Sequence, residues 1–509
     1  MPGGSTEAGG AEAPERKSPK ASKAKSKASA SVGEGALEFD GAFETGNLGV
    51  AKRLSKYEWE VRIRPDTHNE RHRLWFNFKV RGADRGQGAL FSVPNFSKGR
   101  SMYRHGMSPL VRSRKRPSWQ RLPPAWVLYY RVPKRKAYVL SFFFTFDDEE
   151  DEYQFAYCFP YGYTDLQRLL YRKDLLALPS YRRELLCRTP QHRRVDLLTI
   201  TAPGPAEHRR VVVLTARVHP GESPASFIMQ GAVDFLTSGD PRAEALRQAC
   251  VFKLVPMLNP DGVALGNYRC NSLGYDMNRY WDDPSPALHP ELFATKQLLL
   301  ASHARGTLDL FIDMHSHSAA PNAFMFANSA EVAKEGYIPP PRPQKGDAAA
   351  GAGGAGAGGA VAGGAVDTRA PFSAPVLGPG APHINHPHHP GRSSRPGAVP
   401  EEWLDEAASL AAWAREACFP RLLGERSPSF SLADTRFDAD PAKEGTGRRA
   451  LGSHVGKGGA LCYTLEASFY GFAPKPAGGG PHRPPAPRAG KPIGNLEPFS
   501  PERCVHARE

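Results

Sequence analysis

The chain has 509 residues, of which 40% are hydrophobic, enough for two packed domains and additional segments outside them. Lys and Arg together number 66 against 52 Asp and Glu, which gives a net charge of +14. A basic excess of this size favours an acidic partner, either nucleic acid, an anionic membrane surface or an acidic protein tail. The charge by itself does not choose among these three.

Seven scattered cysteines without a C-x-x-C pair argue against a disulfide framework and against a structural zinc knuckle, and they suit a reducing compartment. No apolar run approaches the roughly 20 residues of a membrane span. The first residues lack the apolar core of a secretory signal. The sequence therefore predicts a soluble intracellular protein with no membrane partner.

Residues 1–36 are rich in Gly, Ser, Ala and Lys and contain no aromatic residue. They predict a disordered basic tail, because such a stretch cannot bury enough apolar surface to order itself. An organellar transit peptide is the alternative, and it is disfavoured by Glu7, Glu12 and Glu15.

Residues 37–165 contain short runs of aromatic and β-branched residues, separated by Gly, Pro and charged turns. In KYEWEVRIRPD, charged residues alternate with Tyr57, Trp59, Val61 and Ile63, which is the period of a half-buried strand. RLWFNFKV, ALFSVPNF, WVLYYRV, YVLSFFFTF and YQFAYCF repeat the theme. The segment predicts an antiparallel β-sandwich domain.

Residues 166–328 alternate between predicted strands and helices. The apolar strand 211–216 precedes HPGES and the amphipathic run PASFIMQGAVDFLTS, and the strand 251–258 ends at the turn NPDG. PELFATKQLLLASHA predicts a helix, and LDLFIDMHSH predicts a strand. This order is typical of an α/β domain with a largely buried sheet.

Residues 329–415 interrupt the pattern with low-complexity Gly and Ala, and then with a Pro/His/Gly stretch whose HINHPHH run we attribute to composition. They predict a long inserted surface loop, with a local helix in WLDEAASLAAWAREA at its end. The α/β pattern resumes over 416–475 with the strand CYTLEASFYGF. Residues 476–509 are a Pro/Gly-rich C-terminal segment without a closing helix.

A possible metal site follows from three residues at predicted strand ends. A hydrolytic zinc needs three neutral or anionic ligands and one open position. His219 and Glu222 are three residues apart where a buried strand gives way to a helix, the edge at which open α/β sheets place ligands. His315 lies near the end of a second strand, and Asp313 is a candidate to orient a ligand. Each residue alone also has an ordinary structural explanation.

Further polar residues follow in order along the chain. Arg269 and Arg279, the latter preceded by Asn278, offer guanidinium groups, which suit a peptide's terminal carboxylate or an oxyanion near the metal. Glu466 is the only charged residue in the strand CYTLEASFY, where a carboxylate is unfavourable unless it is paired or faces a polar cleft. Catalysis and a buried ion pair both explain it, and for an isolated Glu the ion pair is commoner.

The order HPGE, NPDG, an Arg, NR, D-x-H and a late strand Glu resembles the zinc metallocarboxypeptidases. The cytosolic carboxypeptidase branch is more similar still, through RPDT, WFNF, VPNFSK, MYRHGMSP, WQRLPP, YQFAYCFPY, GNYRC, DMNRYW and CYTLEASFY. The resemblance extends over residues 38–328 and 416–472. It implies a metallocarboxypeptidase domain with a mixed central sheet flanked by helices, preceded by the antiparallel β-sandwich.

The resemblance also implies roles for the residues singled out above. One Zn²⁺ per chain would be held by His219, Glu222 and His315. Glu466 would act as general base and then general acid. Arg269 would stabilise the tetrahedral oxyanion.

On the substrate side, the resemblance places Asn278 and Arg279 at the substrate's C-terminal carboxylate. His317 either lines the cleft or is an exposed loop histidine. Arg448, with Lys443 nearby, is our candidate to neutralise an acidic substrate side chain, and solvated surface charge is the alternative.

The family removes glutamates from protein C-termini or polyglutamate side chains, notably on tubulin. The resemblance therefore implies acidic glutamylated proteins as partners, and a cytoplasmic location with association with microtubules, centrioles or cilia. The basic tail and the cluster of Arg112, Arg114, Lys115 and Arg116 also suit acidic tubulin tails.

Three alternatives remain open. A nucleic-acid-binding protein would explain the charge but not the ordered His, Glu and Arg residues, so we expect no nucleic-acid partner. A catalytically inactive tubulin-binding protein would normally have lost a ligand or the base. A zinc acylase of related fold is the nearest enzyme alternative, and Asn278-Arg279 together with the N-terminal sandwich favour the peptidase.

Overall fold

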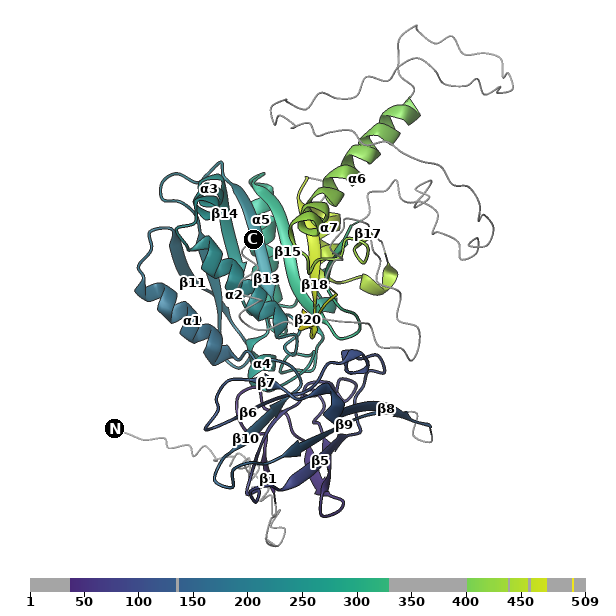
Figure 1. Ribbon diagram of the computed structural model, residues 1–509. Helices are drawn as coiled ribbons and strands as arrows, with labels where there is room; N and C mark the ends of the chain where they lie inside the picture. Colours follow the sequence, from purple (N-terminus) through teal and green to yellow (C-terminus); the bar gives the residue numbers. More distant parts are fainter. Residues whose placement is uncertain are drawn as a thin grey trace, which may run out of the picture.

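The computed structural model describes residues 37–133, 137–328, 401–437, 440–455, 459–473 and 497–498 (Figure 1). The predicted basic tail, the low-complexity part of the predicted insertion with its HINHPHH run, and nearly all of the C-terminal segment lie outside these residues. The described chain forms a β-sheet domain and an α/β domain that contact each other directly.

The N-terminal domain consists of two five-stranded sheets around one aromatic-rich core. The first has the order β1 (Glu38–Asp40), β4 (Asn77–Arg81), β10 (Tyr153–Ala156), β6 (Leu110–Ser113) and β7 (Gln120–Arg121). The second has the order β2 (Val50–Arg53), β3 (Glu58–Arg62), β5 (Gly88–Val93), β9 (Ala137–Thr145) and β8 (Val127–Val132). The predicted alternation is present in β3, where Trp59 and Val61 are buried.

Neighbouring strands are antiparallel in both sheets except for β3 and β5, which pair in parallel. The intervening strand β4 belongs to the opposite sheet, so the chain enters β5 in the direction of β3. The sandwich is therefore antiparallel as predicted, with this one exception.

The α/β domain is built on an eight-stranded mixed sheet. Its order is β11 (Tyr181–Arg188), β12 (Arg194–Ile200), β14 (Cys250–Val255), β13 (Arg210–Ala216), β15 (Leu308–His317), β18 (Leu461–Ser468), β16 (Ala323–Ala327) and β17 (Arg436–Phe437). The four central strands β14, β13, β15 and β18 are parallel to one another. Their carboxyl ends therefore meet at one edge, which faces the sandwich (Figure 1).

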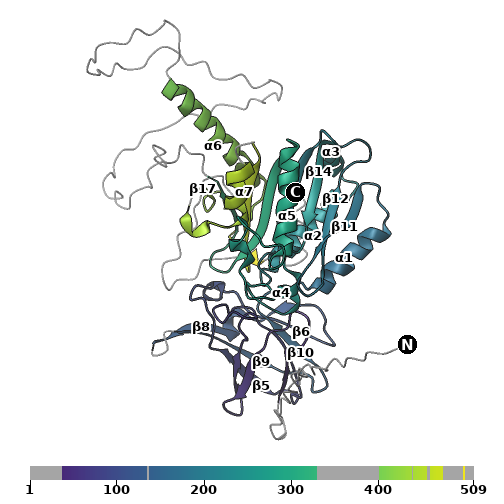
Figure 2. The same ribbon diagram turned by 180° about the vertical axis from the view of Figure 1, so that it is seen from behind.

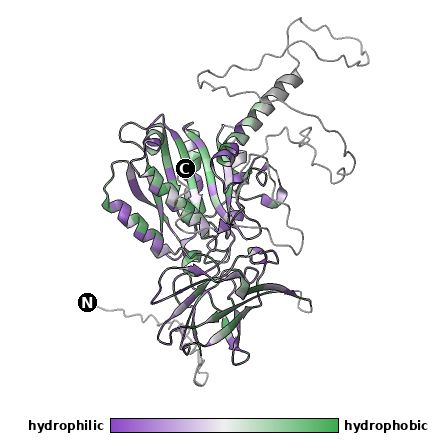
Figure 3. Cartoon of the chain, viewed as in Figure 1, coloured by the Kyte–Doolittle hydropathy of each residue, from purple (hydrophilic) through white to green (hydrophobic). Residues whose placement is uncertain are grey.

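Helices cover both faces of the mixed sheet. α1 (Tyr163–Leu175) and α2 (Pro224–Leu236) lie on one face, and α5 (Pro290–Ala304) and α7 (Gly447–Val455) lie on the other (Figures 1 and 2). The shorter helices α3 (Pro241–Ala249) and α4 (Pro260–Ala264) follow α2 and β14. Because both faces are covered, the central strands are hydrophobic along their length, as Figure 3 shows in green.

Helix α6 (Glu401–Arg426) runs through the boundary predicted at residue 415. The helix expected in WLDEAASLAAWAREA thus continues into the α/β domain, where Phe419 and Leu423 pack against the sheet's core. The expected boundary falls inside a helix, because the local composition does not show where packing against the sheet begins. No helix in the described part of the chain is long and apolar enough to cross a bilayer.

Candidate active site

The HPGE turn connects the end of β13 to the start of α2. Gly221 is required there, because a Cβ at this position would lie 2.9 Å from the Tyr268 Cα. The Gly221 amide donates a hydrogen bond to the Tyr268 carbonyl oxygen at 2.8 Å. Beneath the turn, the buried Arg217 guanidinium donates to the Pro220 carbonyl oxygen and, at 2.8 Å, to the Ser226 hydroxyl. These contacts fix His219 and Glu222 at the carboxyl edge of the sheet.

The parallel register of β15 and β18 pairs His315 directly with Glu466. His315 is buried, and Glu466 lines the same cavity as the two residues of the HPGE turn. The neighbouring strands β13, β15 and β18, which are distant in sequence, therefore bring these side chains together at one edge of the sheet.

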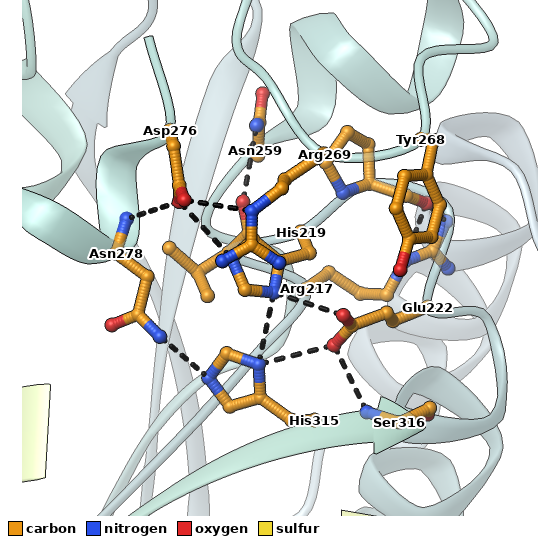
Figure 4. A network of polar contacts seen from close by, with 12 residues as sticks. Arg217, His219, Glu222, Asn259, Tyr268, Arg269, Asp276, Asn278, His315 and Ser316 are labelled. Carbon is orange, nitrogen blue, oxygen red and sulfur yellow. Dashed lines mark hydrogen bonds and ion pairs between the residues drawn. The ribbon is translucent and has the colours of Figure 1, made fainter. Parts of the chain in front are cut away.

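His219, Glu222 and His315 converge on one point (Figure 4). The carboxylate oxygens of Glu222 lie 2.9 Å from His219 Nδ1 and 3.0 Å from His315 Nδ1. The two Nδ1 atoms are 3.1 Å apart. Two imidazoles and one carboxylate are the ligand types of a hydrolytic zinc with an open position, so the donor set fits this ion. It is the one such group among the described residues.

A carboxylate holds the other ring nitrogen of each histidine. His315 Nε2 lies 2.9 Å from Asp313 Oδ2, and Asp313 Oδ1 accepts a hydrogen bond of 2.7 Å from the Thr215 hydroxyl. His219 Nε2 lies 3.1 Å from Asp276 Oδ1. Such contacts fix the tautomer and orientation of a metal-binding imidazole. Asp313 was expected in this role from the sequence, whereas Asp276 was not.

The charges of this group shift its pKa values in a consistent way. Burial raises the pKa of Glu222, but His219 and His315 outweigh it and hold that pKa well below its usual value. Burial by itself would raise the pKa of Asp276. His219 and Arg269 outweigh burial and hold this pKa below its usual value. For Glu466, burial raises the pKa and His315 only partly offsets this. Of these three carboxyl groups, Glu466 is thus the one that takes up a proton most readily.

The predicted site residues line a single cavity of about 180 Å³. They are His219, Glu222, Arg269, Asn278, Arg279, His315, Arg448 and Glu466. His317 lines the same cavity, as expected for the cleft wall, and so do Lys443 and Lys98. Lys98 comes from the sandwich domain, and no role for it was foreseen.

Residues 39–158 match the cytosolic carboxypeptidase N-terminal domain, and residues 179–352 match the zinc carboxypeptidase family. The chain is 41% identical over 445 residues to human cytosolic carboxypeptidase 6, covering 86% of this chain and 73% of that protein. It is 36% identical to cytosolic carboxypeptidase 6 of Caenorhabditis elegans, covering 86% and 80%. The chain belongs to the cytosolic carboxypeptidase family. Membership confirms the predicted resemblance and the zinc cofactor.

Solved structures share the fold of this carboxypeptidase. A metallo-carboxypeptidase from Pseudomonas aeruginosa superposes with a TM-score of 0.60 at 22% identity, covering 92% of this chain and 96% of that one. A metallo-carboxypeptidase from Burkholderia cenocepacia gives 0.57 at 22% identity, covering 85% and 90%. The predicted fold class is therefore confirmed.

The three arginines of the cavity differ in their hydrogen-bond partners. The Arg269 Nε donates to Asp276 Oδ2 at 2.7 Å, and Arg279 donates to the Asn278 carbonyl oxygen at 2.7 Å. Arg448 is only 1% exposed and donates to the Ala327 carbonyl oxygen at 2.7 Å. The alternative that Arg448 is a solvated surface charge is therefore wrong.

The sandwich domain positions the loop that carries Arg269. The carboxylate of Asp66, between β3 and β4, accepts hydrogen bonds from the backbone amides of Tyr268, Arg269 and Cys270 at 2.6, 2.7 and 2.8 Å. Asp66 is 2% exposed, so these bonds are shielded from water. The motif RPDT contains this residue, but no local pattern indicates which distant loop its side chain reaches.

The predicted basic cluster at 112–116 is partly neutralised. Lys115 pairs with Asp148 at 2.6 Å and Arg116 pairs with Asp147 at 2.6 Å. The Arg112 Nε donates to the Gln154 side chain at 2.9 Å. The cluster is thus a weaker attractor of acidic tails than its sequence suggests.

Proposed function

We propose that this carboxypeptidase hydrolyses C-terminal or side-chain-linked glutamates from proteins, with glutamylated tubulin as a substrate. The observation that carries the proposal is the charge of the cavity around the zinc-ligand group. Five of its lining residues are cationic, namely Lys98, Arg269, Arg279, Lys443 and Arg448, and two are carboxylates, Glu222 and Glu466. Because Glu222 is committed to the ligand set, the cavity favours a substrate that brings several negative charges.

In this proposal, His219, Glu222 and His315 hold the Zn²⁺. The ion supplies polarisation of the scissile carbonyl and activation of water. Glu466, whose pKa is raised by burial, takes the proton of the attacking water and returns it to the leaving amine. Arg269 is aimed by its bond to Asp276 and stabilises the negative charge that develops on the carbonyl oxygen.

The leaving glutamate would present two carboxylates to the cavity. Asn278 and Arg279 would bind the α-carboxylate, because they adjoin the ligand group through the 3.3 Å contact between Asn278 Nδ2 and His315 Nε2. Arg448 and Lys443 would bind the side-chain carboxylate. A guanidinium suits this task, since its planar fork matches a carboxylate and burial reduces screening by water.

The same observations weigh on the alternatives. A zinc acylase would share the ligand group, and the Asn278-Arg279 pair together with the N-terminal sandwich domain favours the peptidase. A catalytically inactive tubulin-binding protein would not need Glu466 beside His315. We propose acidic glutamylated proteins as partners, without nucleic acid or membrane, and a cytoplasmic location with microtubule, centriole or cilium association.

The test is glutamate release from polyglutamylated tubulin by the purified protein. We expect release by the wild type, loss after treatment with a chelator and recovery after zinc is added back. The Glu466→Gln variant should bind zinc but release no glutamate. Equal release by this variant would refute the mechanism. Hydrolysis of an N-acyl amino acid, without release from tubulin, would favour the acylase.

Specificity is tested with two peptides that end in Glu or Gln and are otherwise identical. Arg448→Met should lower kcat/KM for the Glu peptide by about 10-fold or more while changing the Gln peptide little, since it removes one charge-assisted hydrogen bond. An equal loss on both peptides would assign Arg448 a structural role only.

A further inference from the structure

Lys98 is the cationic residue of the cavity to which the proposed function gives no task. It belongs to the loop after β5, in the sandwich domain, and it lines the cavity together with the zinc-ligand group. Its ammonium contacts the Tyr268 hydroxyl and lies 4.8 Å from the centre of the Tyr268 ring. The Tyr129 hydroxyl donates to the Lys98 carbonyl oxygen at 3.0 Å, which fixes the backbone. No ion pair in the described part of the chain involves this lysine.

The position of Tyr268 shows which side of the cavity Lys98 occupies. In Figure 4, Tyr268 and Asn278 lie on opposite sides of the group formed by His219, Glu222 and His315. The leaving residue is assigned to the side of Asn278. A peptide that continues across the zinc site from the leaving residue would place the residues before the scissile bond on the side of Tyr268 and Lys98.

The cations on the side of the leaving residue already have negative groups of the substrate assigned to them. Arg279 would take the α-carboxylate of the leaving glutamate, Arg448 and Lys443 would take its side-chain carboxylate, and Arg269 would take the oxyanion. One cation remains, on the opposite side, and a phenol hydroxyl is its side-chain partner. A phenol is a weaker partner for an ammonium group than a carboxylate is.

We propose that Lys98 binds the acidic side chain of the residue that precedes the scissile bond. The enzyme would then select chain ends with two consecutive acidic residues, and the sandwich domain would supply part of the specificity site. This inference rests on the proposed function, since it takes the direction of the substrate from Asn278 and Arg279. It adds the penultimate residue of the substrate to the residues that the enzyme recognises.

The experiment compares peptides ending in Glu-Glu and in Gln-Glu, which differ only in the charge of the penultimate residue. For the wild type we expect kcat/KM to be about 10–100-fold higher for Glu-Glu, the effect of one charge-assisted contact. Lys98→Met should bring the ratio close to one by lowering the Glu-Glu value alone. Lys98→Arg should retain part of the preference. Lys52→Met, at an exposed position of β2 outside the cavity, is the matched control and should leave both values unchanged.

The outcomes distinguish a failure of the inference about Lys98 from a failure of the proposed function. Release from both peptides without a preference in the wild type would overturn this inference and leave the proposed function standing. An equal fall on both peptides in Lys98→Met would show that the lysine only supports the loop, which also overturns it. Release from neither peptide by zinc-loaded wild type would overturn the proposed function and this inference together.

Discussion

Replacing Asp276 by Asn tests whether the loop that carries Arg269 supports the zinc ligands. Asp276 Oδ1 lies 3.1 Å from His219 Nε2, and Oδ2 accepts a 2.7 Å hydrogen bond from Arg269 Nε. Asp276 also caps the short helix Met277–Arg279 by accepting from the Asn278 amide at 3.2 Å. Asn can keep this cap but removes the negative charge. The backbone should therefore persist while both side-chain contacts weaken.

Two magnitudes follow from these contacts. Loss of the carboxylate that orients a metal-binding histidine lowers metal affinity by about 10–100-fold, or about 1.4–2.7 kcal/mol. Removing one partner of a buried ion pair lowers the free energy of unfolding by about 3–5 kcal/mol. The Arg269 and Asp276 side chains are 17% and 18% exposed, so we expect a value of about 3 kcal/mol, at the low end of that range.

The assay is a zinc titration against a chromophoric chelator near neutral pH, with chemical denaturation alongside it. Asp234→Asn is the matched control, because Asp234 pairs with Lys173 at 2.7 Å with side chains 20% and 13% exposed. The control should lower stability and leave zinc affinity unchanged. If Asp276→Asn shows the same pattern, with zinc affinity within about twofold of the wild type, Asp276 does not orient His219.

Three further predictions concern single carboxylates. Glu466→Gln should lower kcat by about 10²–10⁴-fold, the usual contribution of a general acid/base, with zinc content unchanged by metal analysis; near-normal turnover would exclude that role. Asp66→Asn should lower kcat by about 10–100-fold with little change in KM, because Arg269 acts on the transition state and its loop loses charge-assisted bonds; steady-state kinetics showing a rise in KM alone would contradict this. Burial raises the pKa of Glu291 from 4.5 to about 8. The fold therefore favours its protonated form, and that stability is complete below about pH 4.5 and is lost progressively as the pH rises from about 4.5 to about 8. Glu291→Gln should remove this loss, so denaturation at about pH 6 and pH 9 should show a smaller decline than in the wild type; equal declines would place the pKa elsewhere.

The sequence by itself indicated a β-sandwich followed by an α/β domain and the order of the three candidate metal ligands. Strand β3 is recognisable from its alternating apolar and charged residues, because only every second residue faces the core. Strand β13 is recognisable from its continuous apolar run, because both faces of its sheet are covered. His219 and Glu222 lie within one turn of chain, so their proximity is a local property. The convergence of His315 and Glu466 could also be anticipated, because both lie near the carboxyl ends of strands that pair in parallel and share an edge.

Only the tertiary structure decided which side chains support and surround that group. Asp66 is 202 residues from Tyr268, and no periodicity relates the two positions. The burial of Arg448, the placement of Lys98 in the cavity and the pairing of Lys115 with Asp148 are likewise set by how separate elements pack. Hydrophobic patterns specify which face of an element is buried, whereas polar contacts depend on positions fixed to within an ångström by the whole fold. The sequence therefore indicated where the candidate zinc site lies, and the fold supplied the contacts that orient its side chains.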